Sequence, residues 1–84
     1  MEVVGICDLK PDRVLNCVGL RCPEPVLRTR VELDRISADE LLEVIADDPA
    51  AEADVRSLVK RLGQELVYVR RDGERFHFFI RKTG

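Results

Sequence analysis

Gly-Leu-Arg-Cys-Pro-Glu-Pro, residues 19–25, joins a short strand-like segment to a helix-like one. Proline is tolerated in the first turn of a helix, where backbone N–H groups have no partner. We therefore expect Pro23 to be the first helical residue and Cys22 to cap the helix. A thiol at that place faces unpaired N–H donors and the positive end of the helix dipole, which favour the reactive thiolate. The stretch predicts a nucleophile at Cys22.

The pattern on either side of this stretch predicts one strand and one helix. Residues 13–17 form the first predicted strand, which Gly19 ends. The helix after it carries one stripe at helical spacing, made of Val26, Thr29, Leu33 and Ile36. Leu27 and Val31 lie about 100° or more around the helix from Val26. These two either widen the buried face or remain exposed as a contact patch, and we favour burial.

The next part of the chain predicts a second strand and a second helix. Residues 41–46 are a near-continuous apolar run, typical of an interior strand covered on both faces or mostly so. Asp48 as cap, with Pro49 in the first turn, indicates the start of a helix that Gly63 ends. Its buried stripe is expected at Ala51, Val55, Leu58, Val59 and Leu62.

The chain ends in a predicted hairpin. Residues 65–70 alternate as a strand, Asp72-Gly73 is a turn signal, and residues 75–81 form the last strand. One face of that strand is expected to carry Phe76, Phe78 and Ile80, and the other His77 and Phe79. The order β-α-β-α-β-β predicts an α+β two-layer sandwich. Its mixed four-stranded sheet has two helices on one face, with parallel strands wherever a helix intervenes.

If the first and second strands are parallel, the loop with Cys22 lies close to the loop with Asp47 and Asp48. The loops after their carboxyl ends then leave the same edge of the sheet, where α/β proteins usually place their sites. Cys22 should therefore lie beside Asp47 and Asp48, although they are far apart in the sequence. The helix terminus and Arg21 favour the thiolate, whereas Glu24 and the two aspartates oppose it. We expect a thiol of moderate acidity.

Composition excludes several classes of protein. The chain has 84 residues, enough for one small domain, and 45% hydrophobic with 36% charged residues indicates a folded protein. No apolar run could span a membrane and no leader pattern is visible, so we expect a cytoplasmic protein without a membrane partner. A net charge of −2 argues against duplex-DNA binding. Residues 1–12 are interpreted as an extension with a possible edge strand at 3–7, and residues 13–84 as the domain.

The three cysteines fit a reducing compartment better than a disulfide framework. The spacing of Cys7, Cys17 and Cys22 contains no Cys-x-x-Cys pair, and with His77 it predicts no zinc site. We interpret Cys17 as a core residue; the alternative is a resolving thiol that forms a disulfide with Cys22. Cys7 is interpreted as incidental. A cysteine hydrolase would need a base beside the thiol, and we interpret His77 as a surface residue of its strand.

Together these motifs resemble one known family. They are Leu15-Asn16-x-x-Gly19-Leu20-x-Cys22-Pro23-Glu24-Pro25, Ile45-Ala46-Asp47-Asp48-Pro49 and Phe79-Ile80-Arg81-Lys82. They are similar to those of the TusA/SirA-like sulfur carrier (sulfurtransferase) proteins, over about residues 14–82. The resemblance implies a two-layer α/β fold, a persulfide carrier, and no metal or organic cofactor.

The resemblance also implies roles for residues and partners. Cys22 would accept sulfane sulfur from a cysteine desulfurase or rhodanese-like donor and pass it to an acceptor such as a DsrE-type protein. The sulfur would serve tRNA thiolation, molybdenum cofactor synthesis or oxidation of reduced sulfur compounds. Arg21, Glu24 and Asp48 become candidates for partner binding or thiol tuning, and Leu20, Leu27 and Val31 for an apolar docking face.

Two positions depart from the family pattern. Asn16 stands where aspartate is common, and Ala53 stands where some members have a basic residue linked to partner docking. The first departure affects local hydrogen bonding, and the second concerns the identity of the partner.

Two other functions stay open from the residues alone. One is a non-catalytic regulatory or RNA-binding module in which Cys22 only caps a helix. It is motivated by basic residues on the hairpin, namely Arg70, Arg71, Arg75, Arg81 and Lys82; a solvated charged hairpin is the commoner case. The other is a thiol redox switch between Cys17 and Cys22. The main interpretation, a sulfur relay, involves no direct contact with nucleic acid.

Overall fold

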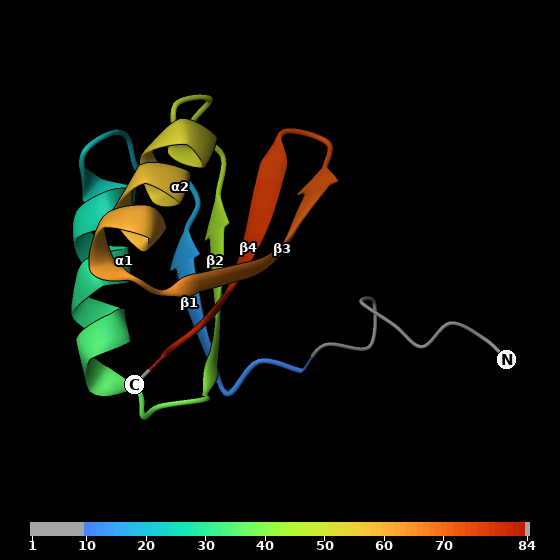
Figure 1. Cartoon of the computed structure of the whole chain (residues 1–84). Coiled ribbons are helices and arrows are strands. Elements are labelled where there is room, and N and C mark those ends of the chain that lie inside the picture. Colours follow the sequence, from blue (N-terminus) through green and yellow to red (C-terminus); the bar gives the residue numbers. More distant parts are fainter. Residues whose placement is uncertain (1–9, 84) are drawn as a thin grey trace, which may run out of the picture.

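The computed structural model describes residues 10–83, which form a four-stranded sheet with two helices packed on one face (Figure 1). The elements are β1 (Arg13–Cys17), α1 (Glu24–Arg35), β2 (Leu41–Ala46), α2 (Ala51–Leu62), β3 (Glu65–Asp72) and β4 (Arg75–Arg81). This order confirms the predicted α+β two-layer fold. The strand expected at residues 3–7 and Cys7 lie outside the described residues. Neither helix in the described part has the length and apolar character to cross a membrane.

The strand order in the sheet is β1-β2-β4-β3. β1 is parallel to β2, with Cys17 opposite Ala46, while β4 is antiparallel to both β2 and β3. The carboxyl ends of β1 and β2 therefore lie side by side. Because each strand is followed directly by a loop, Cys22 and Asp47 leave the sheet at the same edge, as the parallel arrangement predicted.

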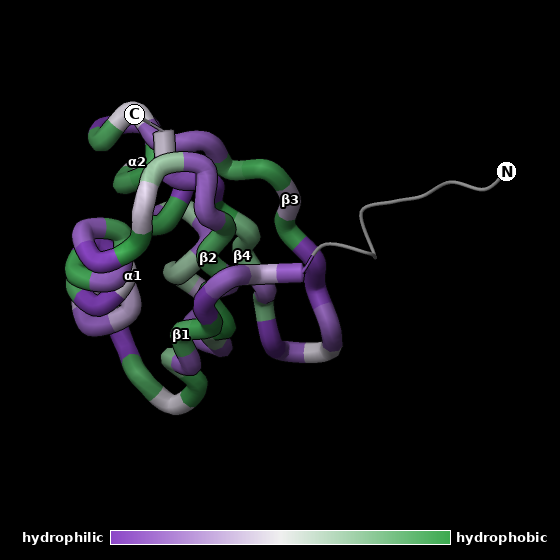
Figure 2. The backbone as a smooth tube through the Cα atoms, turned by 90° about the horizontal axis from the view of Figure 1, so that it is seen from below, coloured by the Kyte–Doolittle hydropathy of each residue, from purple (hydrophilic) through white to green (hydrophobic). Residues whose placement is uncertain are grey.

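The hydrophobic core lies between the sheet and the two helices. Its members include Leu33, Leu42, Val44, Val55, Phe78 and Ile80. Successive residues of a strand point to opposite faces, so the side chains of Phe76, Phe78 and Ile80 share the face under the helices, as predicted. Figure 2 shows hydrophobic residues of β2 and β4 in the middle of the molecule, and mainly hydrophilic ones where β3 turns into β4.

The buried stripe of α1 runs through Pro25, Thr29 and Leu33. Thr29 satisfies its hydroxyl by donating a hydrogen bond to the carbonyl of Pro25 at 2.7 Å. The expectation that Leu27 and Val31 would be buried is wrong, since these residues are 52% and 49% exposed. The stripe already fills the contact with the sheet and α2. Leu27 and Val31 are two positions from its members, about 160° around the helix, so their side chains point away from the contact.

The start of α2 differs from the prediction. The helix begins at Ala51, and Pro49 and Ala50 form a turn before it. Asp48 does not cap the helix itself: its Oδ1 accepts a hydrogen bond from the N–H of Ala50 at 3.1 Å. Asp48 therefore organises the turn that leads into α2. Gly63 ends the helix in the left-handed conformation, as predicted.

The hairpin turn is one residue later than predicted. β3 continues to Asp72, which pairs with Arg75, so Gly73 and Glu74 form the turn. Gly73 has a φ of +63°. Two-residue hairpin turns require a positive φ at their first central residue, which glycine adopts readily. The turn signal was therefore correct in kind; β3 extends to Asp72 instead of Arg70, and β4 has the predicted bounds.

The face of the sheet away from the helices carries a buried contact between a histidine and a glutamate. The Nδ1 of His77 lies 2.6 Å from Oε2 of Glu43, and His77 is only 8% exposed. The interpretation of His77 as a surface residue is wrong, because Glu43 on the adjacent strand β2 contacts it and Phe79, two residues further along β4, lies on the same face. β2 is also less covered than expected, since Glu43 and Ile45 on this face are half-buried. His77 lies on the opposite side of the sheet from α1 and cannot serve Cys22 as a base.

Candidate functional site

Cys22 lies in the loop between β1 and α1, at the carboxyl edge of the sheet. The loop turns through a hydrogen bond from the N–H of Leu20 to the carbonyl of Cys17, 3.1 Å long. Gly19, inside this turn, has a φ of +88°, where a residue with a Cβ would be strained. The thiol of Cys22 is exposed.

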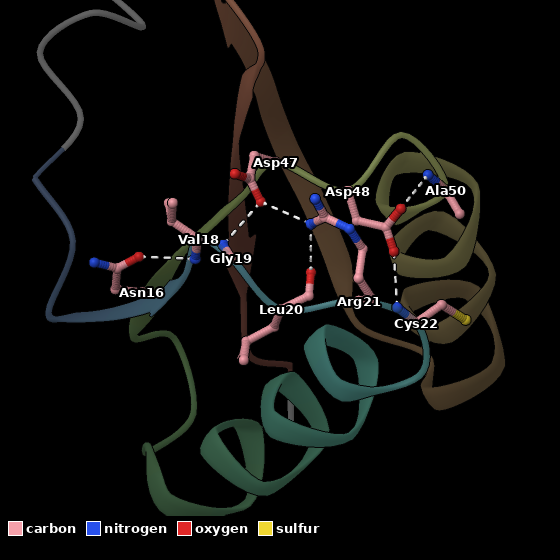
Figure 3. Close-up of polar contacts among 9 residues, drawn as sticks. All are labelled: Asn16, Val18, Gly19, Leu20, Arg21, Cys22, Asp47, Asp48 and Ala50. Carbon is pink, nitrogen blue, oxygen red and sulfur yellow. Dashed lines mark hydrogen bonds and ion pairs between the residues drawn. The ribbon is translucent and has the colours of Figure 1, made fainter.

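Two aspartates after β2 hold this loop. The Oδ1 of Asp47 accepts the N–H of Gly19 at 2.9 Å and lies 3.3 Å from Nη1 of Arg21. The Oδ2 of Asp48 accepts the N–H of Cys22 at 2.7 Å (Figure 3). The predicted proximity is confirmed for Asp48, which contacts Cys22 directly, whereas Asp47 contacts Gly19 and Arg21 of the same loop. The contact runs through the backbone of Cys22, so the carboxylates position the cysteine.

Asp48 is a positioning residue. It is only 7% exposed, and each of its two oxygens accepts one backbone N–H. The N–H groups of Ala50 and then Cys22 lower its pKa, because hydrogen bonds to the charged form stabilise it. Because Asp48 is buried, it has little surface with which to contact a partner. Of its two predicted roles, thiol tuning fits the structure better than partner contact.

The other two candidate residues are paired with neighbours. Arg21 contacts Asp47, whose pKa is lowered mainly by the N–H of Gly19 and further by Arg21. Glu24 accepts a hydrogen bond from Nε of Arg28 at 3.3 Å, one turn along α1. Both Arg21 and Glu24 are exposed. Partner binding stays a prediction for them.

The helix start beside Cys22 differs from the expected one. α1 begins at Glu24, Pro23 is its N-cap, and Cys22 is one residue further out. Pro23 and Pro25 have no N–H, and the N–H of Glu24 is donated to the carbonyl of Arg21 at 2.8 Å. A helix start ordinarily offers several free N–H donors. Here the motif itself removes most of them, so the thiolate gains less than predicted.

The pKa of the Cys22 thiol is raised. The largest cause is a hydrogen bond to the carboxylate of Asp54, followed by partial desolvation and by the charges of Asp54 and Asp48. A neighbouring negative charge disfavours the thiolate. The Cys22 thiol is therefore less acidic than the sequence predicted. The residue responsible, Asp54, was not among the predicted site residues.

Asp54 belongs to a groove between the start of α1 and one side of α2. The groove measures about 260 Å³ and is lined by Cys22, Pro23, Val26, Asp54, Ser57 and Arg61. The three residues from α2 stand at spacing i, i+3 and i+7, which places them along one line of a helix. That spacing is visible in the sequence. What the sequence does not show is that this line faces Cys22.

Cys17 is far less accessible than Cys22. It is 0% exposed within the core, and burial raises the pKa of its thiol. The core interpretation is correct, and a resolving thiol in this position could not reach an oxidised Cys22 without opening the loop. Among residues 10–83, no three His, Cys, Asp or Glu side chains gather as metal ligands would.

Comparison with known proteins identifies a family to which the chain is similar. The model of the family described as sulfurtransferase TusA matches residues 13–82. The sulfur carrier protein TusA of Allochromatium vinosum is 39% identical over 72 residues, covering 86% of this chain and 95% of its own. That of Pseudomonas putida GB-1 is 40% identical over 77 residues, covering 92% and 96%.

Two further similarities agree with this. A putative sulfur carrier protein of Archaeoglobus fulgidus is 55% identical over 53 residues, which cover 63% of this chain and 69% of the relative. The crystal structure of a SirA-like protein from Desulfitobacterium hafniense superposes with a TM-score of 0.74 at 18% identity. It covers 86% of this chain and 99% of that one. At that identity the superposition supports the fold alone.

Proposed function

The chain belongs to the sulfurtransferase TusA family, and we propose that it is a sulfur carrier that holds sulfane sulfur as a persulfide on Cys22. The relatives named sulfur carrier protein support the carrier role. One observation supports Cys22 in particular: its thiol is exposed at the sheet edge while Asp48 holds its backbone. A relay between proteins needs a thiol that is both accessible and fixed in place.

Sulfur transfer onto Cys22 balances without an oxidant. The Sγ of Cys22 attacks the outer sulfur of a donor persulfide, a new S–S bond forms, and the S–S bond of the donor breaks. The inner sulfur of the donor leaves as a thiolate and takes up the proton that Cys22 loses. Unloading repeats the exchange, with a cysteine of the acceptor as the attacking group.

An exposed apolar pair on α1 supports docking by a protein partner. Leu27 and Val31 are exposed on α1, and with Leu15 they line a hollow of about 360 Å³. Leu20, the third predicted docking residue, is partly buried against the core and contributes less. Exposed apolar side chains that cluster in this way often mark an interaction site.

The class of partner is also a proposal. We assign the donor to cysteine desulfurases or rhodanese-like proteins and the acceptor to DsrE-type proteins, with tRNA thiolation, molybdenum cofactor synthesis or sulfur oxidation as destinations. Family membership supports a relay between proteins. Ala53 offers no docking charge, and the nearby Arg56 is bound to Glu52 at 3.1 Å.

The two alternatives receive less support. A redox switch would pair Cys22 with Cys17, which is buried. An RNA-binding hairpin would need free basic side chains. Here Arg71 lies over the ring of Phe76, 5.2 Å from its centroid, and Arg81 contacts Glu65 at 3.9 Å.

Intact mass after incubation with a small-molecule persulfide tests the proposal. Wild type should gain the mass of one or more sulfur atoms, lost again on reduction, and Cys22→Ser should gain none. Cys17→Ala is the matched control, because it removes a buried thiol and should still be loaded. Loading of Cys22→Ser equal to wild type, or no loading of wild type while its thiol reacts with iodoacetamide, would contradict the proposal.

A further inference from the structure

Asp54 is the side chain that faces the thiol from the second helix. With Ser57 and Arg61 it forms the α2 wall of the groove, and Cys22 and Val26 stand opposite. Cys22 and Asp54 line the same groove, and the carboxylate of Asp54 raises the pKa of the Cys22 thiol. Asp54 is half-buried, so water and salt screen this contact less than they would on an open surface.

The carboxylate acts in opposite ways on the two states of a carrier cysteine. In the empty state, the neutral S–H of Cys22 donates to Asp54. In the loaded state, an outer sulfur about 2 Å beyond Sγ carries the negative charge of the persulfide anion. That anion has no proton to donate and is repelled by the carboxylate. The same contact therefore favours one state and disfavours the other.

We infer that Asp54 sets the direction of the sulfur relay, because it stabilises the empty Cys22 thiol against the loaded persulfide anion. This inference rests on the proposed carrier function of Cys22. During unloading, the thiolate of the acceptor attacks the outer sulfur, and the bond between that sulfur and Sγ breaks. Sγ then takes a proton from solvent and donates it in a hydrogen bond to Asp54. The sulfane sulfur keeps its oxidation state, so no oxidant or reductant is consumed.

The other charged groups around Cys22 do not replace Asp54. Asp48 adds negative charge, but its oxygens are occupied by backbone N–H groups. Arg21 and Glu24 are each paired with another side chain. Arg61 lines the other end of the groove, about two turns of α2 away from Asp54. In the described part of the chain, Asp54 is thus the carboxylate that can distinguish an S–H from a persulfide anion.

Asp54→Asn tests the inference with two measurements. The first is the rate of Cys22 alkylation by iodoacetamide as a function of pH. Loss of the charge should move the profile to lower pH and raise the rate at about pH 8 several-fold. The second is the partition of sulfur between the protein and glutathione at equilibrium, which should shift several-fold toward loaded Cys22.

Glu52→Gln is the matched control, because Glu52 lies in the same first turn of α2 and pairs with Arg56 instead. Glu52→Gln should match wild type in both measurements. Asp54→Ala also removes the charge and should give the changes expected of Asp54→Asn, so it replaces that variant if the amide disturbs folding. An unchanged alkylation profile, or an unchanged partition on chains that do take up sulfur, would overturn the inference alone. Failure of wild type to take up sulfur would overturn the proposed function, and the inference with it.

Discussion

Asp48 accepts the backbone N–H of Cys22 at 2.7 Å, and this bond ties the loop after β1 to the loop after β2. The two residues are brought together by the parallel pairing of β1 with β2. The bond leaves the thiol of Cys22 free while fixing its backbone. Both oxygens of Asp48 thus hold backbone N–H groups, those of Cys22 and Ala50.

Asp48→Ala should lower the stability of the protein and disturb the cysteine loop. It leaves the N–H groups of Ala50 and Cys22 without their acceptor, and an unsatisfied buried donor is costly. We expect the melting temperature to fall by several degrees. Asp34→Ala, at an exposed aspartate of α1, is the control and should melt like wild type. Equal melting temperatures for both variants would refute a positioning role for Asp48.

Stability should decrease in acid because of the same loop contacts. Asp47 and Asp48 both have a pKa below the ordinary carboxyl value of 3.8 in the folded protein. The unfolded chain therefore binds more protons below that value, so the free energy of unfolding falls as pH is lowered through the folded pKa. Denaturation at a series of pH values from about 5 downward measures this. Asp48→Asn should show a shallower decrease than wild type, and an equally steep one would speak against the assignment.

The native protein should be alkylated at Cys22 and spared at Cys17. Cys22 is exposed, whereas Cys17 is fully buried. The raised pKa of Cys22 means that its reaction with iodoacetamide should accelerate as pH increases above the ordinary thiol range. Mass mapping of the modified peptides, in native buffer and in denaturant, gives the comparison. Modification of Cys17 in native buffer at the rate of Cys22 would show that the loop opens readily.

Replacing the apolar pair on α1 should affect protein partners and spare small donors. Leu27→Asp with Val31→Asp removes exposed apolar surface, and surface changes usually cost no more than about 0.5 kcal/mol. We expect slower loading from a cysteine desulfurase and unchanged loading from a small-molecule persulfide. Val14→Asp, also at an exposed apolar residue, is the control. A uniform loss with both donors would mean that the substitutions damage the fold and not a docking face.

Leu42→Ala should destabilise the whole domain. Leu42 is fully buried in β2, between β1 and β4 and under the helices. Such a truncation typically costs about 2–5 kcal/mol, because it removes buried surface and leaves a cavity. Urea denaturation measures the loss. A cost near that of Val14→Ala would contradict the central position of Leu42 in the core.

The backbone arrangement was largely predictable from local patterns. The apolar run at 41–46, the alternation in the last strand and the Gly63 stop each depend on residues only a few positions apart. These are the distances over which strand and helix periodicity act. The start of α2 and the hairpin turn were each misplaced by one or two residues, because adjacent residues such as Asp48 and Pro49, or Asp72 and Gly73, all favour turns.

The fate of individual side chains was harder to predict. Leu27 and Val31 are apolar and exposed. The stripe through Pro25, Thr29 and Leu33 already occupies the contact between α1 and the rest of the core. His77 is buried because Glu43, on another strand, offers it a partner. In both cases burial depends on how much surface the neighbouring elements present.

The sequence by itself determined the element order, the parallel pairing of β1 with β2, and hence the meeting of Cys22 with Asp47 and Asp48. Those results follow from periodicity, turn residues and the handedness of strand–helix–strand connections. Only the tertiary structure decided the direction in which the pKa of the cysteine is shifted. The pKa of Cys22 depends on Asp54, which contacts the thiol from the second helix. That contact depends on how α1 and α2 pack, and electrostatic interactions follow distance in space, not separation along the chain.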